Sequence, residues 1–259
     1  MRIENEKFWF HRLNLELNLW IGVPNHPGPY RVLYMHDGQN LFKDVWASYQ
    51  MAWKIDQALE ACQMNDVLVV GIEAPHGWRR VDAYAPFEID YEELVTEKVK
   101  GGEGKAYLED LISTVIPFVE THFDILKGPE HTAMMGASMG GIISLYAGFE
   151  YPEIFGRIAS LSGAYYVSLK AFTHYLKGPF NQVPNILYLD VGDQEEGLAT
   201  QGIYVNVHQQ IDEALNPYKN QMKYQSKIIK GGVHNERAWE QRLPDILPFL
   251  WANKEDLSC

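Results

Sequence analysis

The chain has 259 residues, 46% of them hydrophobic, and a formal net charge of -12 at pH 7. That length and apolar content allow one large core, so we expect a single domain over residues 1–259. Because nucleic-acid binding usually requires a basic surface, the acidic balance excludes a protein held mainly by phosphate contacts, and no nucleic-acid partner is expected.

The chain carries no signal of secretion or membrane insertion. Its first residues contain no apolar run of signal-peptide length, and no segment approaches the ~18 apolar residues of a membrane span. The two cysteines, Cys62 and Cys259, do not suggest a disulfide framework and fit a reducing compartment. We therefore expect a cytoplasmic protein without a membrane partner.

The first half of the chain predicts an antiparallel strand followed by a β-α-β unit. Apolar residues occupy every odd position of Leu13–Val23, which is typical of a half-buried antiparallel strand. A short buried strand at Val32–Met35, a helix over Met51–Gln63 and a continuous apolar strand at Val67–Ile72 follow.

Strands and helices continue to alternate to the end of the chain. An apolar stripe predicts a helix over Tyr107–Phe123, in which Pro117 is a candidate kink. The remaining predicted strands are Thr132–Met135, Ile158–Leu161, Ile186–Val191 and Tyr224–Ile229, and the remaining predicted helices are Gly141–Phe149, Ile203–Leu215 and Glu236–Trp251. This order predicts an α/β fold with a mostly parallel central sheet, an antiparallel N-terminal strand and helices on both faces.

Two connections, 73–106 and 164–184, are longer than usual. Ligands bind beyond the carboxyl ends of parallel strands, so we predict that both segments are pocket-forming insertions. Their aromatic residues include Trp78 and Tyr165, which we expect in the substrate pocket.

Two adjacent arginines, Arg79 and Arg80, lie in the first insertion. Either could pair with an anionic substrate, and we place Arg80 among the pocket residues. A surface salt bridge with Asp82, Glu88 or Asp90 is an equally good interpretation.

The residues Gly136-Ala-Ser-Met-Gly140 form a G-x-S-x-G motif between a predicted strand and a predicted helix. Such a turn exposes the serine hydroxyl at the sheet edge, and glycines on either side remove colliding side chains. Ser138 is therefore the predicted nucleophile. The alternative is a glycine-rich turn with a helix-capping serine; a phosphate-binding loop fits less well, because no lysine follows the glycines.

A serine nucleophile requires a general base and an orienting acid. His234 follows a late strand and precedes the last helix, as the serine-then-histidine order of this fold class requires. His208 lies within a predicted helix, and His131 lies at the opposite end of the strand before Ser138. For the acid we choose Glu195, which follows the strand Ile186–Val191; Asp193 is second, and Glu196 also competes.

Two backbone N–H groups should form an oxyanion hole. One belongs to Met139, directly after the nucleophile, and the other to Gln39, in the loop after an early central strand. His36 and Asp37 in that loop lack the spacing of a metal motif, so we expect neither a metal nor a cofactor.

Three segments together, 36–42, 136–141 and 231–235, resemble the Putative esterase family of α/β hydrolases, which includes feruloyl esterases, S-formylglutathione hydrolase and siderophore esterases. The resemblance implies acyl-ester chemistry. Carried over by position, it implies Ser138 as nucleophile, His234 as base, Glu195 as acid, and Gln39 and Met139 as oxyanion donors.

The sequence therefore predicts a serine carboxylic-ester hydrolase that forms an acyl-enzyme on Ser138, with His234 as general acid and base and a small-molecule ester as substrate. One alternative is an acyltransferase that uses the same triad, and another is a non-catalytic binding protein on the same fold. Trp239, Trp251 and the apolar C-terminal helix suit either a core or a subunit interface, which leaves a homo-oligomer open.

Overall fold

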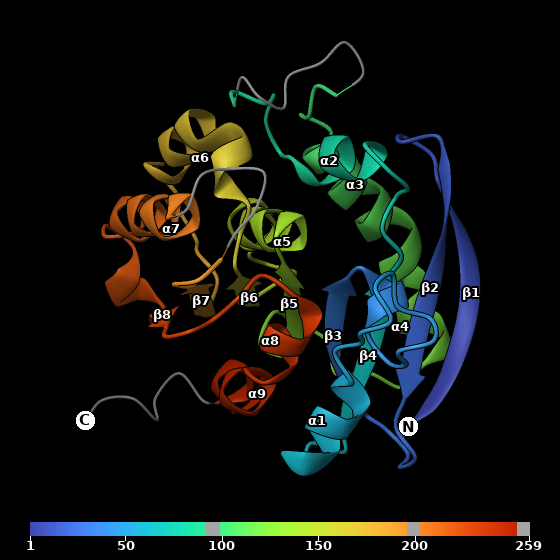
Figure 1. Ribbon diagram of the computed structural model, residues 1–259. Coiled ribbons are helices and arrows are strands. Elements are labelled where there is room, and N and C mark those ends of the chain that lie inside the picture. Colours follow the sequence, from blue (N-terminus) through green and yellow to red (C-terminus); the bar gives the residue numbers. More distant parts are fainter. Residues whose placement is uncertain (92–98, 196–201, 253–259) are drawn as a thin grey trace.

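A computed structural model of the protein describes residues 1–91, 99–195 and 202–252, and within these ranges eight strands form one sheet. Its order is β1-β2-β4-β3-β5-β6-β7-β8, seen in Figure 1 from β8 on the left to β1 on the right. The strands are β1 (Arg2–Phe10), β2 (Leu15–Val23), β3 (Arg31–His36), β4 (Val67–Ile72), β5 (Thr132–Ala137), β6 (Arg157–Leu161), β7 (Ile186–Gly192) and β8 (Lys223–Ile229).

The pairing of the strands confirms the predicted mostly parallel sheet. Only β2 pairs antiparallel with its neighbours β1 and β4, whereas all pairs from β4 to β8 are parallel. The carboxyl ends of β3, β5, β6, β7 and β8 therefore share one edge, where the connecting loops meet.

Helices cover both faces of the sheet, as predicted. They are α1 (Ile55–Ala61), α2 (Arg79–Tyr84), α3 (Gly104–Asp110), α4 (Ile116–His122), α5 (Met139–Glu150), α6 (Leu169–Leu176), α7 (Ile203–Ala214), α8 (Glu236–Glu240) and α9 (Leu243–Trp251), with short turns η1 (Gly38–Asn40), η2 (Leu111–Val115), η3 (Tyr165–Ser168) and η4 (Lys219–Gln221). Apolar residues of α1, α8 and α9 share one core cluster, and those of α2 to α7 share the other.

The two core clusters follow from the two-residue period of the strands. In β3, Leu33 and Met35 contribute to the cluster under α1 and α9, while Val32 and Tyr34 contribute to the opposite cluster. Because both faces are covered, inner strands such as β4 and β7 are apolar at nearly every position, which is why they were recognisable in the sequence.

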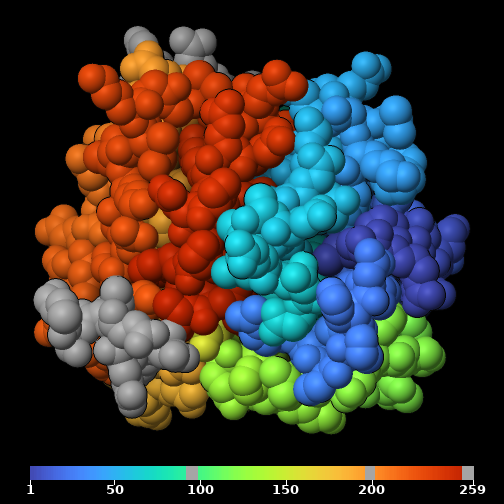
Figure 2. Space-filling view, turned by 90° about the horizontal axis from the view of Figure 1, so that it is seen from below, coloured from blue at the N-terminus to red at the C-terminus, as the bar shows by residue number. Residues whose placement is uncertain are grey.

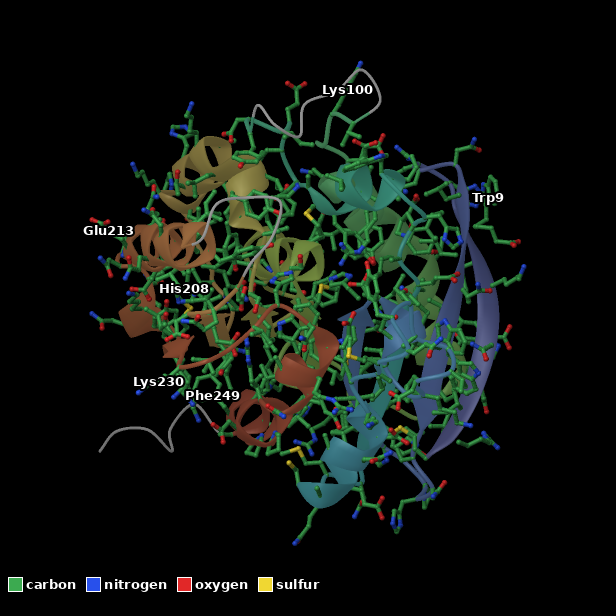
Figure 3. The ribbon with its side chains drawn as sticks, viewed as in Figure 1. Trp9, Lys100, His208, Glu213, Lys230 and Phe249 are labelled. Carbon is green, nitrogen blue, oxygen red and sulfur yellow. The ribbon has the colours of Figure 1, made fainter. Side chains whose placement is uncertain are left out.

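The N-terminal end of the sheet differs from the prediction. One antiparallel strand was expected at Leu13–Val23, but β2 begins at Leu15, and β1 forms a second strand at the sheet edge. Asn14 has φ 53, which breaks the extended backbone before Leu15. The strand β1 escaped prediction because its residues are mostly exposed and polar, although Trp9 on its outer side is large (Figure 3).

Three predicted helices have different bounds. The expected helix over 51–63 is helical only in α1, because Lys54 has φ 50 and the N–H groups of Trp53 and Ile55 donate to the loop at Asn40 and Leu41. The helix over 107–123 is continuous, but it contains a π-helical turn, η2, just before Pro117 in the first turn of α4. A proline lacks an N–H, and the wider turn relieves its clash with the preceding carbonyls.

The predicted C-terminal helix is divided into α8 and α9, with Pro244 in the first turn of α9. Trp239 and Trp251 are 6% and 9% exposed, so both lie in the core. Figure 2 shows this red C-terminal region directly beside cyan α1, in agreement with the contacts between α9 and α1. Across the described ranges, no helix has the length and apolar content needed to span a membrane.

Candidate active site

Ser138 occupies a strained turn between β5 and α5. Its backbone has φ 57 and ψ -120, outside the regions that side chains with a β-carbon normally adopt. A β-carbon on Gly136 would lie 2.6 Å from the backbone of Gly140, so the turn closes only with glycine there. The N–H of Ser138 donates to the carbonyl of Leu161 at 3.0 Å, which fastens the turn to β6.

His234 lies in the loop between β8 and α8 and contacts a carboxylate. Its Nδ1 lies 3.0 Å from Oε2 of Glu195. The imidazole is enclosed by two aromatic rings, with the centroid of Tyr204 at 4.7 Å and that of Trp239 at 5.0 Å. These contacts restrict the ring to one orientation.

Glu195 is the carboxylate that contacts the imidazole, and its side chain is fully buried. Its Oε1 accepts from the N–H of Gly192 at 2.6 Å and from the hydroxyl of Ser162. Burial raises the pKa of Glu195, but the hydrogen bonds from His234 and Ser162 more than offset this, so its pKa lies below the ordinary value.

Of the two competing carboxylates, the structure describes Asp193, whose hydrogen bond is with another group. Asp193 accepts the N–H of Gly231 at 2.7 Å and so braces the histidine loop from outside. Glu196 lies outside the described residues.

A buried polar network stands behind Glu195. The Ser162 hydroxyl accepts from Nε1 of Trp239 at 2.9 Å and from Nη1 of Arg242 at 3.1 Å. Both acceptor positions of the hydroxyl are thus filled, which directs its single proton to Glu195. Arg242 also donates to Asp190 at 2.8 Å, and burial raises the pKa of Asp190 to about 6. Sequence patterns did not indicate this role for Ser162, Asp190 or Arg242, and they predicted only a core or interface position for Trp239.

Ser138 and His234 line the same cavity, whose volume is about 460 Å³. The other lining residues are Asp37, Gln39, Asn40, Ser48, Tyr49, Met51, Trp53, Arg80, Ala137, Asn235, Glu236 and Trp239. The folded chain therefore brings the predicted nucleophile, the predicted base and the predicted oxyanion residue Gln39 to one hollow at the carboxyl edge of the sheet.

Of the two predicted oxyanion residues, Gln39 lines the cavity and Met139 directly follows the lining residue Ser138. Met139 is the first residue of α5, where an N–H has no acceptor within the helix. Gln39 lies in η1, directly after β3, and its side-chain Oε1 accepts the N–H of Ala74 at 3.2 Å. That bond ties the turn to the segment that follows β4.

The predicted pocket residues have three different positions. Arg80 lines the cavity and pairs with Asp37, whereas Arg79 pairs with Glu103 and Asp82. Trp78 is 53% exposed and lies outside the cavity lining.

The prediction is wrong for Tyr165. This residue is 1% exposed and does not line the cavity, because its ring is buried and its hydroxyl pairs with that of Ser160. No described residue of the 164–184 insertion lines this cavity, and the described part of 73–106 contributes only Arg80.

His208 has a structural position on α7, labelled in Figure 3. Its Nε2 lies 2.9 Å from the hydroxyl of Ser226, and burial lowers its pKa to about 4. Over residues 1–91, 99–195 and 202–252, no group of three His, Cys, Asp or Glu side chains is arranged to hold a metal ion.

A comparison with protein-family models identifies the family of this chain. The family model described as Putative esterase matches residues 11–250 of this chain. The chain belongs to the Putative esterase family. The resemblance predicted from the three motifs is thereby confirmed.

Relatives found by sequence and by structure align with most of this chain. The uncharacterised protein YbbA of Bacillus subtilis (strain 168) is 25% identical over 229 residues, which is 86% of each protein. The BES protein from Bacillus cereus has a TM-score of 0.76 and 20% identity, over 98% of this chain and 97% of that one.

The enterobactin esterase FES from Shigella flexneri, solved in the presence of 2,3-di-hydroxy-N-benzoyl-glycine, has a TM-score of 0.74 and 20% identity. The similarity covers 97% of this chain and 60% of that one. At such identities the structures establish the α/β-hydrolase fold, which confirms the predicted fold class.

Proposed function

We propose that the protein is a serine carboxylic-ester hydrolase that works through an acyl-enzyme on Ser138. The observation that carries the proposal is the shared cavity of Ser138 and His234, with the imidazole held by the buried Glu195. Membership in the Putative esterase family supports ester hydrolysis independently of this geometry.

Each residue has a defined task in the proposed reaction. Nε2 of His234 removes the proton of the Ser138 hydroxyl, whose oxygen attacks the ester carbonyl. The N–H groups of Gln39 and Met139 donate to the oxyanion, and the imidazolium, stabilised by Glu195, returns its proton to the leaving alcohol. Water then attacks the acyl-enzyme with His234 again as base, which releases the acid and restores the serine.

The cavity wall favours a substrate with an apolar or planar part. Trp53, Trp239, Met51 and Tyr49 lie along it, and rings of this kind accept flat groups by stacking. The solved relative FES was crystallised with a ligand that carries a benzoyl ring. We therefore propose small esters with an aromatic acyl or alcohol part as the substrate class.

The test measures hydrolysis of p-nitrophenyl acetate and p-nitrophenyl benzoate, together with labelling by a fluorophosphonate probe. The native protein should hydrolyse the esters and be labelled once, and Ser138→Ala should lose both. Ser113→Ala is the matched control, because Ser113 is an exposed serine on η2, away from the cavity.

Two results would redirect the proposal. Absence of both turnover and labelling in the native protein would leave a binding protein on this fold. Product that shifts from acid to transferred ester as an alcohol is added would show an acyltransferase, which uses the same acyl-enzyme with a different acceptor.

A further inference from the structure

The turn that carries Gln39 is held by side chains at both of its ends. Asp37, directly before η1, has φ 57 and ψ 49, a left-handed conformation that aspartate tolerates better than most residues with a β-carbon. At the other end, Asn40 accepts the N–H of Ser48 at 2.8 Å and donates to Glu236 at 3.2 Å. The orientation of the Gln39 N–H therefore depends on contacts from outside the turn.

Arg80 makes the contact at the Asp37 end. Its Nε and Nη2 donate to the two carboxylate oxygens of Asp37, each at 2.7 Å. Two parallel bonds between planar groups fix the carboxylate in angle as well as distance. The guanidinium also lies 5.3 Å from the ring centroid of Tyr84, so α2 supplies both the arginine and an aromatic ring that packs against it.

The charge of Arg80 is compensated within the cavity. The side chains of Arg80 and Asp37 are only 26% and 14% exposed, so water screens their attraction little. With its counter-charge in place, Arg80 is poorly suited to serve as a receptor for a substrate anion. Arg79, one residue earlier, is 38% exposed and does not line the cavity.

We propose that Arg80 is a positioning residue, which holds the Gln39 N–H in the oxyanion hole through its paired bonds to Asp37. The inference rests on the proposed esterase function and adds a residue to it. An oxyanion donor acts on the transition state more than on the bound substrate, so displacement of Gln39 should lower kcat and leave KM nearly unchanged.

The test compares Arg80→Ala with the matched control Arg79→Ala on a neutral and an anionic ester. In Arg80→Ala, kcat should fall about 100-fold on both esters, the size of an effect from one lost oxyanion donor. KM should stay near the native value, and millimolar guanidinium should restore part of kcat in this variant alone. Arg79→Ala should keep the native kcat.

Other outcomes overturn the inference. A native kcat in Arg80→Ala would remove Arg80 from the positioning of Gln39, and a rise in KM confined to the anionic ester would assign it to substrate binding. If circular dichroism shows that Arg80→Ala is unfolded, Arg80→Lys decides, because lysine keeps the charge and loses the paired bonds to Asp37. A lowered kcat at an unchanged Tm in this variant supports the inference, and a native kcat overturns it. An inactive, unlabelled native protein would refute the esterase function itself, whereas an active one with unaffected variants would refute only the role of Arg80.

Discussion

Replacing Glu195 by glutamine should move the imidazole proton of His234 from Nδ1 to Nε2. In the native protein both oxygens of Glu195 accept, Oε1 from Gly192 and Ser162 and Oε2 from Nδ1 of His234. If the glutamine oxygen keeps the first two bonds, its NH₂ group faces Nδ1, which must then accept. The proton moves to Nε2, the nitrogen that has to take the proton of Ser138.

The expected loss is large in rate and modest in stability. In serine triads the corresponding change lowers kcat by about 10⁴-fold, or about 5.5 kcal/mol of barrier. The glutamine amide could instead turn so that its oxygen accepts from the imidazole. Its NH₂ group would then face the N–H of Gly192, and one buried donor without an acceptor costs about 1–3 kcal/mol of folding free energy. The assay is kcat and KM for p-nitrophenyl acetate, with urea unfolding of each variant.

The control for Glu195→Gln is Asp193→Asn in the same loop. Asp193 bonds to Gly231 and makes no contact with the imidazole, so its amide variant should keep most of the native kcat. The reasoning is refuted if Glu195→Gln retains near-native kcat, or if Asp193→Asn loses as much as Glu195→Gln.

Three further changes test the structure around the site. Burial lowers the pKa of His208 to about 4, so its contribution to stability is present above pH 6.5, the ordinary value, and is lost as pH falls toward 4. His208→Gln should therefore remove up to about 3 kcal/mol of the stability that the native protein loses between these pH values, as measured by urea unfolding. An unchanged dependence of the unfolding free energy on pH would contradict this prediction. A β-carbon at Gly192 would lie 2.2 Å from the carbonyl oxygen of Gly232. Gly192→Ala should therefore separate the loops of Glu195 and His234, lower the free energy of unfolding by about 1–3 kcal/mol and lower kcat. A native Tm together with a native kcat would count against this prediction. Arg242→Met leaves Asp190 buried without its cation and should cost about 3–5 kcal/mol, which a native urea midpoint would exclude.

Local patterns were sufficient for the parallel strands and the serine turn. Strands such as Val67–Ile72 are covered on both faces, so their apolar run is a direct consequence of burial. The motif at Ser138 is equally local, because the glycines serve a turn that closes within five residues. Elements that depend on distant partners were not recognisable, and β1 is the clearest example, since it pairs with β2 and packs Phe8 and Phe10 against Phe118 and Tyr107.

Side-chain partners across the sheet edge were the hardest to predict. Arg80 lies next to several acidic residues in the sequence, yet its carboxylate is Asp37, which the fold brings near from another loop. Ser162 is a similar case, because its role depends on Arg242 and Trp239 arriving from the C-terminal helices. Glu195 and Asp193 differ only in which side of one loop each faces, a detail that depends on the close approach of Gly192 to Gly232.

The dependence of Glu195 on Arg242 and Trp239 affects how the protein matures on the ribosome. The turn of Ser138 can form as soon as β5, β6 and α5 have emerged, but the proposed acid, the proposed base and the network behind them lie far later in the chain. A nascent chain that ends before His234 thus has the serine turn and lacks the imidazole proposed as its base. The proposed site is complete only when synthesis has passed Arg242.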